Sequence, residues 1–188
     1  MPMKNILSIA TIILLTISAA SAQKTNEAIS NQIKSLKADK TIALSYDGGP
    51  DTSKIMVTAD NFDGKEASNA GIQAMNFGMA FFYQGKVLNA SPETINLTFW
   101  VLTKKPKFAT AHSWTVTLAN EKLKLGDARY AAKSGDNMEY LNFKISCADL
   151  KKIAAESDVR FHLGDADFTF TPAQLTIFKN LLAISDNH

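Results

Sequence analysis

Cysteine is almost absent from the sequence: Cys147 is the only one among 188 residues, so no disulfide can form within one chain. Small secreted domains usually rely on disulfides for stability. A chain of this length can instead bury roughly 70% of its unfolded surface around one hydrophobic core. We therefore expect a single domain, held together by packing alone.

Neither sign of charge is in excess, since 20 Lys and Arg residues face 18 Asp and Glu residues. The lysines are spread along the chain, apart from two short groups at Lys104–Lys107 and Lys151–Lys152. Proteins that bind nucleic acid normally carry a basic stripe interleaved with aromatic side chains. The lack of such a stripe argues against a nucleic-acid partner.

Long apolar runs are lacking except for Ile6–Ile17, which follows a positive charge at Lys4. Small residues at Ala20–Ala22 come next, an arrangement typical of a cleaved secretory signal. The run is shorter than the roughly 20 apolar residues that span a bilayer, and no cysteine follows for lipid attachment. We predict that residues 1–22 are removed and that 23–188 form a secreted or periplasmic domain without an integral membrane span.

Motifs of common hydrolases are also missing. The sequence has no Gly-x-Ser-x-Gly elbow, no His-Glu-x-x-His and no glycine-rich phosphate loop. The Ser-x-x-Lys match at Ser21–Lys24 straddles the predicted cleavage site, and we interpret it as chance. No catalytic residue and no cofactor is predicted. A hydrolase whose site is assembled from distant residues, such as Asp47, Asp51 or His112, is one alternative.

Two acidic loops, Asp47–Asp51 and Asp60–Glu66, contain oxygen ligands of the kind that calcium prefers. Neither has the EF-hand spacing, and the first contains Pro50. Asp and Asn before Gly are ordinary turn residues, because their side chains bond the local backbone and tolerate positive φ. We therefore predict turns, and no metal site, in both loops.

Cys147 and three histidines are the remaining candidates for a nucleophile or a base. Cys147 lies on the apolar stripe of a predicted helix, which indicates a packed thiol; a catalytic thiolate needs an exposed, electropositive setting. His162 lies on the polar face of a predicted strand, His112 has no partner in sequence, and His188 is the last residue given. No catalytic pattern emerges from these side chains.

What the sequence does contain is a series of short segments in which apolar and polar residues alternate, a pattern typical of half-buried strands. The segments are Thr41–Tyr46, Lys54–Phe62, Ile72–Tyr83, Val87–Leu88, Thr94–Thr103, Ser113–Leu118, Lys122–Ala132, Met138–Ser146 and the hairpin from Val159 to Phe170. About nine or ten strands joined by tight turns predict an antiparallel β-sandwich or a partly open barrel. A sheet curled around the last helix is the alternative.

Two of these segments, and one polar stretch between two others, have special features. Gly78, inside Ile72–Tyr83, predicts a bend or a close backbone approach. In Lys122–Ala132 the apolar phase changes, and one extra residue at Gly126–Asp127 would restore it, as a β-bulge does. The polar stretch Asn61–Gly71 is predicted to be flexible and to bury little.

Helices are predicted at the start and end of the domain. Lys24–Lys40 has a thin apolar stripe. Ser146 and Asp149 predict a capped helix after Met138–Ser146. Thr171, followed by Pro172 and Gln174, predicts the last helix, whose apolar face is Leu175, Phe178, Leu181 and Leu182. The two C-terminal helices are expected to cover an open end or face of the sheets.

The order strand, capped helix, hairpin, capped helix between Met138 and Ile184 includes the stretches ISCADLKKIA and VRFHLGDADFTFTPAQL. Together with the preceding signal, this order resembles small secreted bacterial proteins with a β-sandwich-like fold and no assigned function. The resemblance implies a sandwich-like fold and a secreted location, and it implies no catalytic residue.

Aromatic residues supply the one binding candidate. Core packing accounts for most of the group formed by Phe81, Phe82, Tyr83, Trp100 and Trp114. Phe82 and Trp100, however, are out of phase with the main apolar face of their strands, and if both are exposed they form a binding patch.

These observations predict a binding or accessory module without enzymatic activity, acting on a protein or small-molecule partner. A second alternative to this function is a carrier of an apolar ligand. Its closed cavity would be lined by Phe77, Phe81, Phe99 and the last helix, and would exceed roughly 300 Å³.

Overall fold

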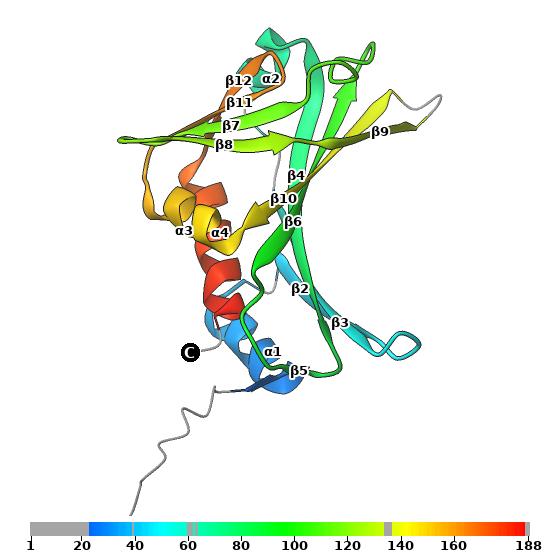
Figure 1. Ribbon diagram of the computed structural model, residues 1–188, viewed down its shortest axis with the longest axis vertical. Coiled ribbons are helices and arrows are strands. Elements are labelled where there is room, and N and C mark those ends of the chain that lie inside the picture. Colours follow the sequence, from blue (N-terminus) through cyan, green and yellow to red (C-terminus); the bar gives the residue numbers. More distant parts are fainter. Residues whose placement is uncertain (1–22, 39, 60–61, 63, 134–136, 187–188) are drawn as a thin grey trace, which may run out of the picture.

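The computed structural model describes residues 23–38, 40–59, 62, 64–133 and 137–186, which form three antiparallel sheets and four helices (Figure 1). The predicted signal 1–22, three residues of the second acidic loop (Asp60, Asn61 and Asp63), residues 134–136 and His188 lie outside the described residues. In the described part, no helix is long and apolar enough to cross a membrane.

The largest sheet has six strands, in the order β2 (Ile42–Asp47), β3 (Thr52–Ala59), β4 (Ile72–Gln84), β6 (Thr94–Thr103), β10 (Met138–Ser146) and β9 (Arg129–Lys133). A four-stranded sheet has the order β12 (Ala166–Phe170), β11 (Val159–Leu163), β7 (Ser113–Thr117) and β8 (Lys122–Asp127). A short ladder joins β1 (Lys24–Thr25) to β5 (Val87–Leu88). The predicted fold class is confirmed, and within the described residues the sheets do not close into a barrel.

The four-stranded sheet lies across the upper part of the six-stranded sheet, and the helices α3 (Cys147–Ala155) and α4 (Pro172–Ser185) lie below it against the same face (Figure 1). Alternation along the strands directs apolar side chains into this space. On β6, for example, Ile95, Leu97, Phe99 and Val101 are fully buried. The six-stranded sheet therefore has one face in the core, which we call the inner face, and one outer face.

Phenylalanine rings fill the centre of the core. Phe62 lies among five of them, with ring centroids 5.4–6.1 Å away. These neighbours come from both sheets, and they are Phe77, Phe99, Phe161, Phe168 and Phe170. Tilted and edge-on arrangements prevail, as aromatic quadrupoles favour.

The expectation that Asn61–Gly71 buries little is wrong. Strand β3 ends at Ala59, and Phe62 lies in a connecting segment yet is only 3% exposed. A short helix, α2 (Gly64–Asn69), follows and buries Ala67. The Glu66 carboxylate accepts a hydrogen bond from the Thr169 backbone N–H at 3.0 Å, which attaches α2 to the edge strand β12. Tertiary contacts over a long sequence separation thus order a segment whose local composition is polar.

The predicted single strand Lys122–Ala132 is divided between two sheets. The expected bulge is present, because Trp114 pairs with Gly126 while Thr115 pairs with Lys124, which leaves one residue extra on β8. The chain then leaves the four-stranded sheet at Ala128, whose N–H bonds the His112 carbonyl at 3.0 Å, and it enters the six-stranded sheet as β9. The bulge therefore marks a corner, because the extra residue bends the strand.

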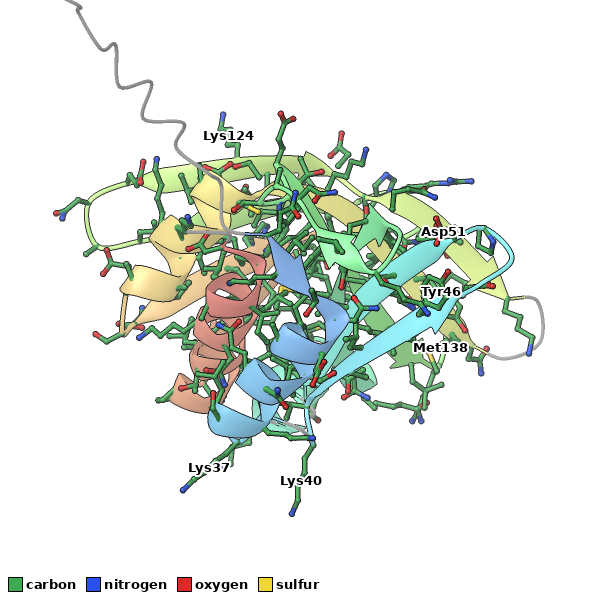
Figure 2. The ribbon with its side chains drawn as sticks, turned by 90° about the horizontal axis from the view of Figure 1, so that it is seen from below. Lys37, Lys40, Tyr46, Asp51, Lys124 and Met138 are labelled. Carbon is green, nitrogen blue, oxygen red and sulfur yellow. The ribbon has the colours of Figure 1, made fainter. Side chains whose placement is uncertain are left out.

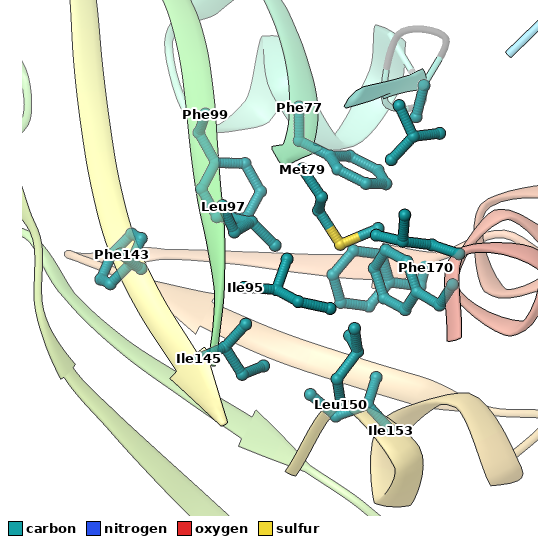
Figure 3. Close-up of a cluster of buried hydrophobic side chains, with 14 of the residues drawn as sticks. Phe77, Met79, Ile95, Leu97, Phe99, Phe143, Ile145, Leu150, Ile153 and Phe170 are labelled. Atoms are coloured by element: carbon teal, nitrogen blue, oxygen red, sulfur yellow. The ribbon is translucent and has the colours of Figure 1, made fainter. Parts of the chain in front are cut away.

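Both predicted C-terminal helix starts are confirmed. Ser146 Oγ accepts from the Asp149 N–H at 3.0 Å, and Thr171 and Gln174 form a reciprocal capping box around the start of α4. Figure 3 shows Leu150 and Ile153 of α3 facing the buried side chains of the six-stranded sheet. The helices cover the part of the inner face that the second sheet leaves open, as expected.

The N-terminal helix is shorter than predicted. Helix α1 runs from Asn26 to Ser35 and buries Ile29 and Ile33. Before it, the Lys24 ammonium donates to carbonyl oxygens at the C-terminal end of α4, those of Ala183, Ile184 and Asp186. A cation at this end of a helix is favourable, because the last carbonyls have no partners within the helix.

Candidate functional site

The outer face of the six-stranded sheet carries the side chains that alternate with the buried ones. On β4 the residues Phe77, Met79 and Phe81 are buried, whereas Phe82 is 53% exposed. On β6 the alternation places Asn96, Thr98 and Trp100 on this outer face. The face therefore combines aromatic rings with neutral polar groups.

Phe82 and Trp100, the two candidate binding residues, line the same open hollow of about 200 Å³. Phe82 is exposed, and the Lys54 ammonium lies 5.7 Å from the centroid of its ring. Trp100 is half-buried. The structure thus brings the two residues together, with one ring more open than the other.

Gly78 explains the position of the Trp100 ring. A Cβ atom at Gly78 would lie 2.4 Å from Cη2 of Trp100 and 3.0 Å from the Val57 carbonyl oxygen. The indole consequently lies against the backbone of β4, in space that any other residue would fill. A close approach of backbone was predicted at Gly78; the group that approaches is instead a side chain, that of the candidate binding residue Trp100.

Two larger hollows adjoin this one. The first, of about 670 Å³, shares Lys54 and Phe82 with it and extends along the β2–β3 hairpin to Tyr46 and Asp47. The second, of about 680 Å³, shares Asn96 and Thr98 with it and extends across β10 and β9. We call the three together the outer trough. Each end hollow shares lining residues with the central one, and together the three are lined by residues of all six strands, which span about 24 Å at the usual strand spacing.

Hydrogen bonds hold part of the trough floor in place. Thr98 Oγ1 donates to Asn142 Oδ1 at 2.8 Å, and Asn142 Nδ2 donates to the Arg129 carbonyl oxygen at 3.2 Å. The exposed Asn96 side chain makes no hydrogen bond to any other described residue, so its amide is available to a ligand as donor and acceptor.

Tyr46, which is 40% exposed, lines the end of the trough at the β2–β3 hairpin. Its hydroxyl donates to Asp51 Oδ1 at 2.7 Å, and the Lys86 ammonium lies 4.5 Å from its ring centroid. The hydrogen bond to Asp51 raises the pKa of Tyr46. Figure 2 shows Tyr46 and Asp51 near the tip of the hairpin. Tyr46 and Phe82 are the large apolar side chains most exposed among the described residues, and both line the trough.

No family model, curated protein or solved structure compared with the chain matches it. The chemistry of the site is therefore inferred from its geometry.

The dispersed residues considered for a hydrolase do not converge. Asp47 and Asp51 belong to the β2–β3 hairpin, at one edge of the six-stranded sheet. His112 stacks on Tyr130 of β9, at the opposite edge, with ring centroids 6.0 Å apart. Asp47 instead accepts the Gly49 N–H at 3.0 Å, which is the role of a turn residue. Among the described residues, no group of three or more His, Cys, Asp and Glu side chains is placed to hold a metal ion.

Cys147 and His162 also lie apart from the trough. Cys147 is half-buried, and burial raises the pKa of its thiol while Lys151 opposes the shift. At neutral pH this favours the thiol, which is a poor nucleophile. The exposed His162 lies on the four-stranded sheet, and its Nδ1 is 2.8 Å from Asp167 Oδ1 across the β11–β12 hairpin.

Sequence reasoning missed Glu139, which is only 1% exposed. Its carboxylate accepts hydrogen bonds from the backbone N–H groups of Lys107 and Phe108 and from the hydroxyls of Thr103 and Tyr130, at 2.9–3.1 Å. The available signal was its position in phase with Leu141 and the other core residues of β10. These contacts fasten the 104–108 loop to the sheet, which is a structural role.

Proposed function

We propose that the protein is a secreted or periplasmic binding module without enzymatic activity, and that it binds an extended ligand along the outer trough. The observation that carries this proposal is the row of three adjoining hollows, whose lining residues come from all six strands. Exposed rings gathered in one concave region are typical of interaction sites.

The open shape of the trough favours an extended ligand. A compact small molecule is usually held in a pocket that covers about 70–90% of its surface. The hollow that contains Phe82 and Trp100 has a volume of only about 200 Å³ and is open to solvent. A chain-like ligand can instead obtain its affinity from many contacts spread along about 24 Å.

The two alternative functions have less support. The rings expected to line a carrier cavity pack against their neighbours: Phe77 lies 5.3 Å from Phe178 of α4 and 6.2 Å from Phe99, centroid to centroid. A carrier would have to separate these rings to admit a ligand. A hydrolase would have to bring together Asp47 and His112, which lie at opposite edges of the six-stranded sheet.

The two tryptophans provide the test. Trp100 lines the trough, while Trp114 is 1% exposed in the core and serves as an internal reference. The protein would be labelled with 5-fluorotryptophan, the two fluorine signals assigned with Trp100→Phe, and the sample titrated with neutral oligosaccharides, anionic oligosaccharides, peptides and short-chain detergents. We expect one class to shift the Trp100 signal saturably without moving that of Trp114.

Phe82→Ala should weaken that response, and Lys179→Ala, on the exposed side of α4, should leave it unchanged. Failure of all four classes to move the Trp100 signal would overturn the proposal. A saturable shift at Trp114 alone would instead point to binding in the core.

A further inference from the structure

We propose that the ligand of the outer trough is a neutral saccharide chain, laid across the six strands with sugar rings against Trp100 and Phe82. This inference rests on the binding function proposed above and specifies the class of ligand. It follows from the chemistry of the trough floor, from the hydrogen bonds already used by its backbone, and from its charges.

The floor of the trough has the mixed character that a sugar ring requires. A pyranose has a C–H face, which packs on aromatic rings, and a rim of hydroxyl groups, which need donors and acceptors. Phe82 and Trp100 supply the aromatic surface within one hollow. Asn96 and Thr98 lie beside them in the same hollow and offer amide and hydroxyl groups.

The backbone of the floor argues against a peptide ligand. Extended peptides usually bind by adding a strand to the edge of a sheet, where backbone N–H and C=O groups are free. Trp100 lies instead on β6, where it pairs with both β4 and β10, and the backbone at Phe82 on β4 is paired with Lys54 of β3. A peptide lying across these strands would lose water from its own amides without gaining backbone partners.

The charges of the trough favour a neutral chain. Lys54, Arg129 and Lys144 are distributed with Asp47 and Asp127, so neither sign prevails. Asp47 and Asp127 lie in the two end hollows of the trough, one at each end. A polyanion would meet a carboxylate at each end, and a polycation would meet three basic side chains. Neutral sugars avoid both repulsions and can accept hydrogen bonds from the Lys and Arg groups.

The test is isothermal titration calorimetry with soluble neutral glucans, mannans, xylans and galactans, alongside a uronic-acid polymer and a pool of extended peptides. We expect at least one neutral polysaccharide to bind, with an affinity that changes little as the salt concentration is raised. Longer oligosaccharides should bind more tightly than short ones, until the chain length matches the trough.

Variants distinguish the loss of sugar–ring stacking from a general loss of folded protein. Trp100→Ala and Phe82→Ala should each weaken saccharide binding by about tenfold or more, whereas Trp100→Tyr should retain most of it. Asn96→Ala should weaken binding, and its matched control Asn69→Ala, at the exposed end of α2, should not. Because Phe82 is exposed, its variant stays interpretable if Trp100→Ala is unstable.

The outcomes distinguish this inference from the function on which it rests. Binding of the peptide pool or the uronic-acid polymer, weakened by Phe82→Ala, would overturn the saccharide assignment and leave the binding module standing. An absence of binding by every class, together with an unmoved Trp100 fluorine signal, would overturn both.

Discussion

On strand β4, Phe77 and Phe82 are the same type of residue, five positions apart, on opposite faces of one sheet. Phe77 is fully buried and its ring contacts those of Phe62, Phe99, Phe170 and Phe178. Phe82 is 53% exposed, and the ammonium of Lys54 lies 5.7 Å from the centroid of its ring. The inner face uses its rings to hold two sheets and two helices together, while the outer face leaves its rings open to solvent.

This difference separates stability from binding within a single sheet. A ring surrounded by other rings contributes to the free energy of folding through buried area and contacts. A ring left in water contributes little to folding, so its surface is still available for burial by a ligand. Substitutions of inner-face residues should therefore lower stability, and substitutions of outer-face residues should lower ligand affinity. Four substitutions test this difference, and they are given in order of decreasing effect on stability.

The largest effect is expected for Phe178→Ala in α4. Its ring lies 5.0 Å from that of Phe170 and 5.3 Å from that of Phe77, so truncation leaves a cavity between the helix and the inner face. The free energy of unfolding should fall by about 3–5 kcal/mol, measured by chemical denaturation. Lys179→Ala, on the exposed side of the same helix, should change it by less than about 0.5 kcal/mol. Equal midpoints for the wild type and Phe178→Ala would show that α4 does not stabilise the fold.

The next effect is expected for Glu139→Ala, near the start of β10. The buried N–H of Phe108 and the neighbouring N–H of Lys107 would lose their acceptor, which should cost about 3 kcal/mol. Glu139→Gln should cost less, because its amide oxygen still accepts. Lys144→Ala, at an exposed position on the same strand, is the control. A loss for Glu139→Ala no larger than that of the control would mean that the 104–108 loop is held by other contacts.

A smaller loss of stability is expected for Gly78→Ala, on the outer face of β4 under the Trp100 ring. The added methyl group would overlap the Trp100 ring and should cost about 1–3 kcal/mol. The same substitution in a Trp100→Ala background should cost less, since the overlapping ring is gone. A double-mutant cycle in urea measures the coupling, and purely additive costs would contradict the observed packing of Trp100 on Gly78.

The smallest effect on stability is expected for Phe82→Ala. Because the side chain is mostly in solvent, the free energy of unfolding should change by less than about 0.5 kcal/mol, while the affinity for a ligand of the trough falls. Thermal denaturation and calorimetric binding on the same sample give both values. A stability loss close to that of Phe178→Ala would mean that Phe82 belongs to the core.

Much of the fold could be predicted because its signals are local. Alternation located β6 and β10 with the residue ranges that the structure has, and the caps at Ser146 and Thr171 placed the starts of α3 and α4. The out-of-phase positions of Phe82 and Trp100 placed both rings on the outer face. These features depend on the residue itself and on neighbours within about one helical turn or a few strand positions.

Other features depend on contacts that no local pattern reports. Phe62 is in a polar stretch, yet rings from both sheets surround it. Glu139 can occupy a core position of β10 because a loop about thirty residues away in the sequence supplies hydrogen-bond donors to its carboxylate. The trough joins residues from the hairpin at Tyr46 to Arg129 on β9, and only the order of the strands brings them onto one surface.

Within the strands and the capped helices, the sequence by itself determined which side chains point toward the core and which toward water, because side-chain direction follows from the period of two in a strand and from the apolar stripe of a helix. The tertiary structure alone decided that the outward residues of six strands lie side by side and form one trough. It also decided that the strand expected at Lys122–Ala132 turns from one sheet into the other at Ala128. The physical reason is that strand order and sheet membership come from pairing between distant segments, whose energies depend on the assembled core.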